Sequence, residues 1–167
     1  SDRVRVIEQA EKYVRGGRIK AAIAEYEKLA LADAQDVGTL NIIGDLYIRL
    51  GNTDRAVLAL EKVAEEYEKR GLYSQALAIS KKIHKLVPDN ADYALKLGDL
   101  YAQQGFVADA KNAYTAIAGR LAQAGKTAEA IAIFEKTVRL DQEDTDARRA
   151  LAGLVQQDFL PTQLPNT

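Results

Sequence analysis

The sequence contains no cysteine, methionine or tryptophan, and it has one histidine and three prolines in 167 residues. The absence of cysteine excludes disulfides, cysteine-ligated metal centres and a thiol nucleophile, and a single histidine excludes a multi-histidine metal site. The 23 basic residues are balanced by 24 acidic residues, whereas a dedicated binder of nucleic acid or of an anionic membrane is normally basic. We therefore expect no metal, no cofactor and no nucleic-acid partner.

The sequence also has no apolar run that approaches the ~18 residues of a membrane helix, so we expect no direct membrane insertion. The chain begins Ser1-Asp2, without an initiator methionine or an apolar leader, which is typical of a fragment or a processed product. These features do not decide the cellular compartment of the protein, although the cytoplasm is favoured. By its length the chain is a single domain.

What the sequence does contain is abundant alanine, leucine, glutamate and lysine, which favour helix, and an internal repeat. Glycines recur at 17, 51, 71, 105 and 125 with alternating long and short spacings, and the pattern repeats with a period of 54. Residues 37–90 align with residues 91–144 without a gap, and Gly44-Asp45-Leu46-Tyr47 falls on Gly98-Asp99-Leu100-Tyr101. The predicted organisation is a partial unit 1–36, full units 37–90 and 91–144, a capping helix 145–158 and a tail 159–167.

Each full unit is expected to hold three helices, which in the first full unit cover 37–50, 53–70 and 73–86. Apolar residues recur three and four positions apart in these segments, as in Leu40, Ile43 and Leu46, and this spacing predicts a buried helical stripe. Gly51 suits the left-handed position that ends a helix, and Pro88 prevents the third helix from continuing.

The repeated residues resemble tetratricopeptide repeats, a pattern of Leu-Gly, a tyrosine, a turn glycine and then small residues in a second helix. The resemblance covers roughly 3–160 and implies an all-α fold, a right-handed helical solenoid of about nine antiparallel helices with one core over 1–160. An ordinary array spaces its turn glycines evenly, whereas here the helix at 53–70 matches both the first-helix and the second-helix patterns. The best-matching residues are Leu40, Ile43, Gly44, Tyr47, Gly51 and Ala56, then Ala94, Leu97, Gly98, Tyr101, Gly105, Ala110 and Tyr114.

Catalysis within these residues is not expected. His84 lies between apolar neighbours, and no motif supplies a nucleophile or a paired carboxylate beside it, so a structural role is favoured. The many carboxylates lie mostly near lysine or arginine at helical spacing, which is typical of a solvated helix face. A third interpretation is an enzymatic activity, either within these residues, where the lone histidine and the absence of cysteine argue against it, or in a domain missing from this fragment.

The resemblance implies that a partner is held by first-helix residues that face a concave groove. The branch of the family that clamps acidic C-terminal peptides needs asparagine and lysine there, but this chain has Asp45 and Asp99 in place of the asparagine and Leu95 in place of a lysine. The recurrent acids favour a basic or mixed ligand, or they serve helix packing and solvation. The predicted partner-binding residues are Asn41, Asp45, Ile48, Arg49, Glu61, Glu65, Leu95, Asp99, Ala102 and Gln103.

The sequence therefore predicts a non-catalytic scaffold that binds a peptide or a partner protein on its concave face. The alternative is an oligomerisation or spacer segment of a larger multidomain protein. Phe159, Leu160 and Leu164 in the tail further suggest self-association, by docking on an apolar helix face.

Because Asp45 and Asp99 replace the asparagine that a carboxylate clamp needs, the chain is expected not to bind acidic C-terminal peptides. The check is a calorimetric titration with a pentapeptide that ends in acidic residues and a free carboxylate. Micromolar binding in that titration would show that the assignment is wrong.

Overall fold

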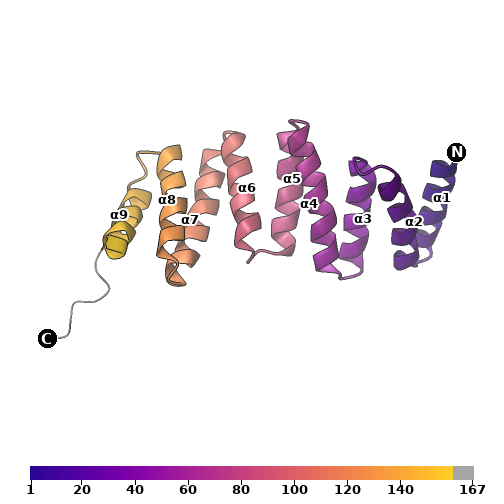
Figure 1. Ribbon diagram of the computed structural model, residues 1–167, viewed down its shortest axis with the longest axis horizontal. Coiled ribbons are helices and arrows are strands. Elements are labelled where there is room, and N and C mark those ends of the chain that lie inside the picture. The colour runs from indigo at the N-terminus through magenta and orange to yellow at the C-terminus, as the bar shows by residue number, and fades with distance from the viewer. Residues whose placement is uncertain (160–167) are drawn as a thin grey trace. The chain divides into compact units, whose positions relative to one another are not determined.

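The computed structural model describes residues 1–159, and their regular structure is entirely helical (Figure 1). The predicted all-α repeat class is therefore confirmed. Residues 160–167 lie outside the described residues, and with them the predicted docking residues Leu160 and Leu164. The described residues form nine helices: α1 Asp2–Arg15, α2 Ile19–Ala32, α3 Val37–Arg49, α4 Thr53–Lys69, α5 Tyr73–Leu86, α6 Ala91–Gln103, α7 Val107–Gln123, α8 Thr127–Leu140 and α9 Thr145–Phe159.

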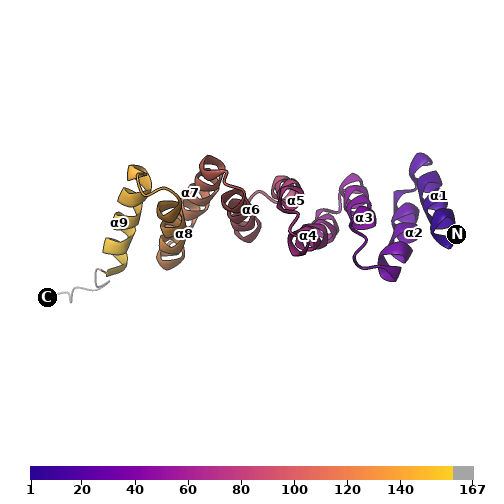
Figure 2. The same cartoon turned by 90° about the horizontal axis from the view of Figure 1, so that it is seen from above.

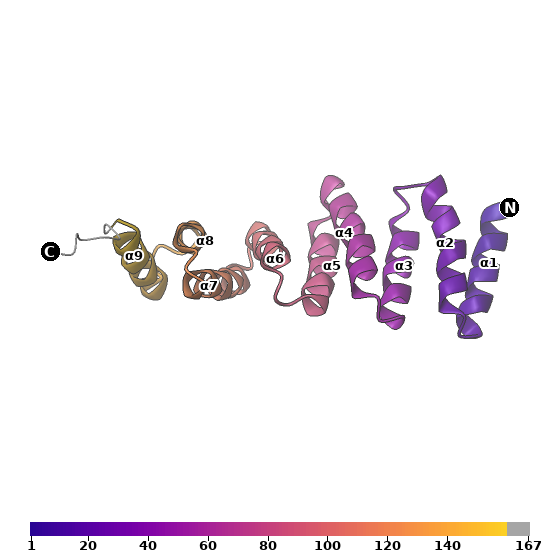
Figure 3. The same ribbon diagram turned by 60° about the horizontal axis from the view of Figure 1, so that its bottom comes forward.

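The chain divides into two compact units, Ser1–Val87 with α1 to α5 and Pro88–Thr167 with α6 to α9. Within each unit every helix packs against the helix that follows it. Figure 1 shows the turns alternating between the two ends of the helices of each unit, so that neighbours run in opposite directions, and Figure 2 and Figure 3 show the same neighbours from two other sides. A single domain over 1–160, one continuous core and a right-handed winding stay predictions.

Five connections between helices are short turns built on glycine. In the first, the Gly17 N–H donates to the Val14 carbonyl (3.0 Å) and the Arg18 N–H donates to the Tyr13 carbonyl (2.8 Å), which is the Schellman arrangement. The same bonds recur at the other four turns, and all five glycines have φ between 73° and 80°. Since a side chain disfavours this left-handed conformation by roughly 1–2 kcal/mol, the backbone explains the glycine period, as predicted for Gly51.

The remaining helix starts depend on polar caps instead of glycine. The side chain of Asp36 accepts a hydrogen bond from the Thr39 N–H (3.1 Å) at the start of α3. Asn90 and Asp144 accept equivalent bonds at the starts of α6 and α9. A cap of this kind satisfies a backbone donor that the helix itself leaves unpaired. Successive caps are separated by one repeat period, so the repeat includes the caps as well as the glycine turns.

Two further glycines permit close contact between neighbouring helices. A β-carbon on Gly44 would lie 2.8 Å from the Leu60 side chain of α4, and one on Gly98 would lie 2.7 Å from the Tyr114 ring of α7. Real β-carbons do not approach neighbours so closely, so glycine is required at both positions. This explains physically why the repeat keeps a glycine within the first helix of each of these two hairpins, after Ile43 on α3 and after Leu97 on α6.

The predicted helix boundaries agree closely with the structure. The helix expected over 73–86 is α5, and those expected over 37–50 and 53–70 end one residue earlier, as α3 and α4. The partial unit 1–36 holds α1 and α2, and the helix predicted over 145–158 is α9. The agreement follows from the glycine turns and polar caps, which mark the helix ends in the sequence itself.

Thr137 generates a stability prediction, because it is fully buried on α8 and its hydroxyl has no hydrogen-bond partner among the described residues. Ile83 and Leu29 occupy the same place one and two repeat periods earlier and are buried apolar residues. Thr137→Val removes an unsatisfied polar group at nearly constant shape, and we expect about 1 kcal/mol of added stability, or roughly 2–4 °C in Tm.

Differential scanning calorimetry measures this change. Thr137→Ser is the matched control, because it keeps the hydroxyl and loses the methyl group, and it should lower Tm. A lower Tm for Thr137→Val would contradict the assignment of an unsatisfied hydroxyl.

Candidate functional site

The predicted partner-binding residues fall into two separate groups. Six lie in the first unit, four on α3 and two on α4, and the other four lie on α6 in the second unit. Asp45, Arg49, Glu65, Asp99 and Gln103 are exposed, and the other five predicted residues are half-buried. The structure brings together the members of each group and leaves the role of the groups as a binding face untested.

The two acids that head these groups form ion pairs within their own units. Asp45 of α3 pairs with Lys82 of α5, and Asp99 of α6 pairs with Lys136 of α8 at 3.0 Å. Each pair joins the first and third helices of a predicted unit, and the second pair repeats the first exactly one period later. Each acid is thus engaged in an ion pair within its own unit, and the paired lysine reduces the negative charge offered to a ligand.

In the second unit the acid has an additional partner. The buried Tyr114 of α7 donates its hydroxyl to Asp99 Oδ1 at 2.5 Å, and Lys136 lies 5.7 Å from the centre of the Tyr114 ring. Burial, followed by the hydrogen bond to the Asp99 carboxylate, raises the pKa of the Tyr114 hydroxyl above its ordinary value. The first unit has Leu60 at this position and lacks the network.

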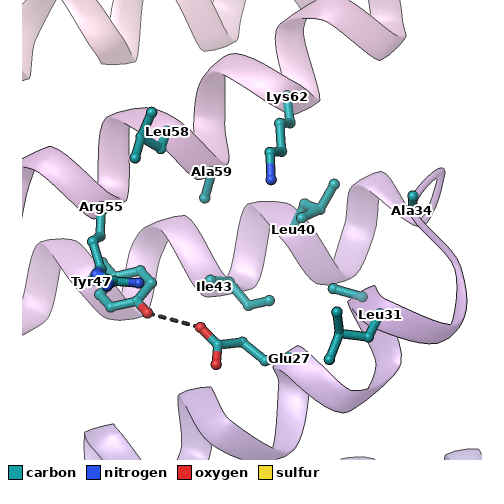
Figure 4. A pocket seen from close by; sticks show the side chains of 11 residues that line it. Glu27, Leu31, Ala34, Leu40, Ile43, Tyr47, Arg55, Leu58, Ala59 and Lys62 are labelled. Carbon is teal, nitrogen blue, oxygen red and sulfur yellow. Dashed lines mark hydrogen bonds between the residues drawn. The ribbon is translucent and has the colours of Figure 1, made fainter.

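A groove that the sequence analysis did not predict lies on another side of α3. It has a volume of about 340 Å³ and an opening to solvent, and it is lined by residues of α2, α3 and α4 and of the turn between α2 and α3. Figure 4 shows Leu31 of α2 and Leu58 of α4 on either side of α3. The lining residues are Glu27, Ala30, Leu31, Ala34, Leu40, Ile43, Tyr47, Arg55, Leu58, Ala59 and Lys62.

Two leucines make this groove unusual. Leu31 is 88% exposed and Leu58 is 60% exposed, although both belong to helices with a well-buried apolar stripe. Ile43 and Tyr47 form part of the groove, and Asp45 lies two residues from each, about 200° around the helix. The groove and the Asp45–Lys82 pair are therefore on opposite sides of α3.

Polar side chains close one end of the groove. The Tyr47 hydroxyl donates to Glu27 Oε1 at 2.8 Å (Figure 4), and Arg55 interacts with the same hydroxyl. Burial raises the pKa of Tyr47, the hydrogen bond and charge of Glu27 raise it further, and Arg55 opposes both. The pair fixes α2 to α3 beside the open apolar surface.

One signal in the sequence could have indicated the groove. The repeat aligns Leu31 with Lys85 and Leu58 with Asn112, one period later in each case. A position that is apolar in one unit and polar in the next is not required to be buried, so an apolar residue there is a candidate for exposure. Both leucines fit the helical spacing, however, so periodicity alone assigns them to the buried stripe.

The described residues offer little for catalysis. No group of three or more histidine, aspartate or glutamate side chains among them could hold a metal ion. His84 is half-buried on α5, and its Nδ1 has no hydrogen-bond partner among the described residues, so its structural role stays a prediction. Within residues 1–159, none of the helices combines the length and the apolar character needed to span a membrane.

Comparison with known proteins identifies the repeat over part of the chain. Residues 7–70 match the tetratricopeptide repeat family, so the resemblance is confirmed there, and domains of this type are typically non-catalytic. No curated protein matches the sequence.

Among solved structures, MamA is similar at 19% identity and a TM-score of 0.47, over 89% of this chain and 94% of that one. TTC0263 from Thermus thermophilus is 19% identical with a TM-score of 0.33, over 91% and 98% of the two chains. YrrB, described as having an unusual peptide-binding site, is 15% identical with a TM-score of 0.35, over 87% and 89%. What these proteins bind is a property of those proteins.

The Tyr114–Asp99 bond generates a prediction about stability. Tyr114→Phe removes a donor to a carboxylate that water can partly replace, so we expect a loss of about 1 kcal/mol at pH 7. Because the pKa of Tyr114 is raised in the folded state, this contribution is fully present below the ordinary tyrosine pKa of 10. It decreases as the pH rises above that value.

Urea denaturation of the wild type and of Tyr114→Phe at pH 7 and above pH 10 measures the effect. The Lys136→Met variant and the double variant complete a thermodynamic cycle, and coupling is expected because both side chains contact Asp99. Equal stability of Tyr114→Phe and wild type at pH 7 would show that the bond contributes nothing.

Proposed function

We propose that this tetratricopeptide repeat chain is a non-catalytic scaffold that binds a protein or peptide partner. We further propose that the groove between α2, α3 and α4 receives an aliphatic part of that partner. The observation that supports the proposal is the pair of leucines, Leu31 and Leu58, exposed on either side of an open apolar groove. Exposed apolar surface of this kind marks interaction sites in folded proteins.

The charges around the groove define the chemistry of the occupant. One acidic residue, Glu27, and two basic residues, Arg55 and Lys62, line it. With two basic side chains against one acidic side chain, the lining carries an excess of positive charge. An aliphatic segment that carries an acidic side chain complements this surface, and a short amphipathic helix or an extended peptide can supply both features.

The partner-binding residues predicted from the sequence, headed by Asp45 in the first unit and by Asp99 in the second, remain a proposal for a further contact in each unit by itself. It is supported by the resemblance and by the exposure of both acids. The ion pairs with lysine make each group a mixed surface, which suits the mixed ligand that was predicted. An Asp45→Lys/Asp99→Lys double variant tests these residues separately, since neither acid lines the groove.

Selection of peptides from a displayed library of random dodecapeptides tests the groove. The wild type is expected to enrich peptides with aliphatic residues and at least one acidic residue. A Leu31→Asp/Leu58→Asp double variant should bind them at least tenfold more weakly, because a buried leucine contributes about 1.5–3 kcal/mol and about 1.4 kcal/mol is tenfold.

The matched control is Val107→Asp, which introduces the same charge at an exposed apolar residue of α7. It should leave peptide binding unchanged, and circular dichroism should show that all variants are equally helical. Selected peptides that bind the double variant as tightly as the wild type would rule out the groove as their site.

A further inference from the structure

The last described helix presents an apolar face whose outer residues are open to solvent. Leu151, Ala152, Val155 and Phe159 of α9 line a shallow, open pocket with Val138 of α8. Val155 is 46% exposed and Phe159 is 89% exposed. The inner side of α9, marked by the buried Ala147, packs on α8.

The repeat shows what normally lies on this face. α9 takes the place that α3 has two repeat periods earlier, and Ala152 takes the place of Gly44. In the first unit α4 packs on this side of α3, with Leu60 against Gly44. The exposed face of α9 therefore corresponds to a face on which the repeat places another helix, although Ala152 carries the β-carbon that Gly44 lacks and so does not admit a neighbour as closely.

We propose that a second copy of this chain covers the face, by antiparallel pairing of the two α9 helices about a twofold axis. In an antiparallel pair centred midway between Ala152 and Val155, each Ala152 lies opposite Val155 of the second copy. The same geometry places Arg148 of one copy opposite Phe159 of the other copy and next to its Asp158. The contact then extends about 16 Å along each helix, from Arg148 to Phe159, at about 1.5 Å per residue.

Charge complementarity supports a second copy as the occupant. Arg148 and Asp158 are both exposed, and neither forms an ion pair with another described residue. In the antiparallel pair each Arg148 meets an acidic side chain and an aromatic ring, and guanidinium groups are attracted to both. A twofold axis makes both contacts twice, and the contact is closed, so it produces a dimer and not a filament.

This surface is separate from the groove of the first unit, so the two proposals fail independently. Sedimentation velocity of the full chain over a range of concentrations measures the assembly, and a concentration-dependent dimer is expected. Val155→Asp should be a monomer of unchanged helicity, whereas Val107→Asp, a control at a similarly exposed valine outside both proposed surfaces, should remain a dimer. A wild type that is monomeric throughout, or a dimer that survives Val155→Asp, would overturn the proposal.

Charge reversal tests the pairing itself. Arg148→Asp and Asp158→Arg should each weaken the dimer at least tenfold, and the double variant should restore it, because the two side chains exchange places across the axis. Truncation after Phe159 should leave the dimer intact. Failure of the double variant to restore the dimer, loss of the dimer on truncation, or assemblies larger than a dimer would each overturn the proposal.

Discussion

The helices of this chain bury their apolar stripes by packing closely against their neighbours. Two glycines, which have no side chain, allow that close approach between α3 and α4 and between α6 and α7. Gly44 leaves room for Leu60, and Gly98 leaves room for Tyr114. The small residues around these contacts follow from the same constraint, since Ala56 and Ala110 are completely buried at the starts of α4 and α7. Once the spacing is fixed, the other sides of α3 and α6 are available for other contacts.

The surfaces of the chain result from how those other sides are used. On α3, one side packs on α4, a second side bears Asp45, which pairs with Lys82 of α5, and a third side faces the groove beside α2. The ion pair is half-exposed, and such pairs contribute little to stability, so its main effect is to reduce the charge of that side. The groove differs because its leucines have no neighbour within the unit to cover them.

Much of the fold could be predicted because its determinants are local. The left-handed glycine at 51 and the cap at Asp36 are visible as single residues, and the ends of α3 lie within two positions of them. The binding surfaces consist of side chains that the neighbouring helices leave uncovered. The apolar periodicity of a single helix does not show which of its side chains these are. Leu58 and Leu60 are both on α4, yet Leu60 is fully buried and Leu58 is mostly exposed. The lysine that pairs with Asp45 lies two helices further along the chain and is equally invisible to local pattern.

The recurrence of the polar caps has a consequence for how such a chain changes in length. Asp36 and Asn90 begin equivalent helices with the same side-chain-to-backbone bond, so a segment cut at these two positions has interchangeable ends. Duplicating or deleting that segment joins a helix end and a helix start that are already joined elsewhere in this chain, so no new type of turn is needed. Growth in whole segments is therefore easy for this architecture, and each added copy is then free to diverge on its exposed sides, as Leu58 and Asn112 already have.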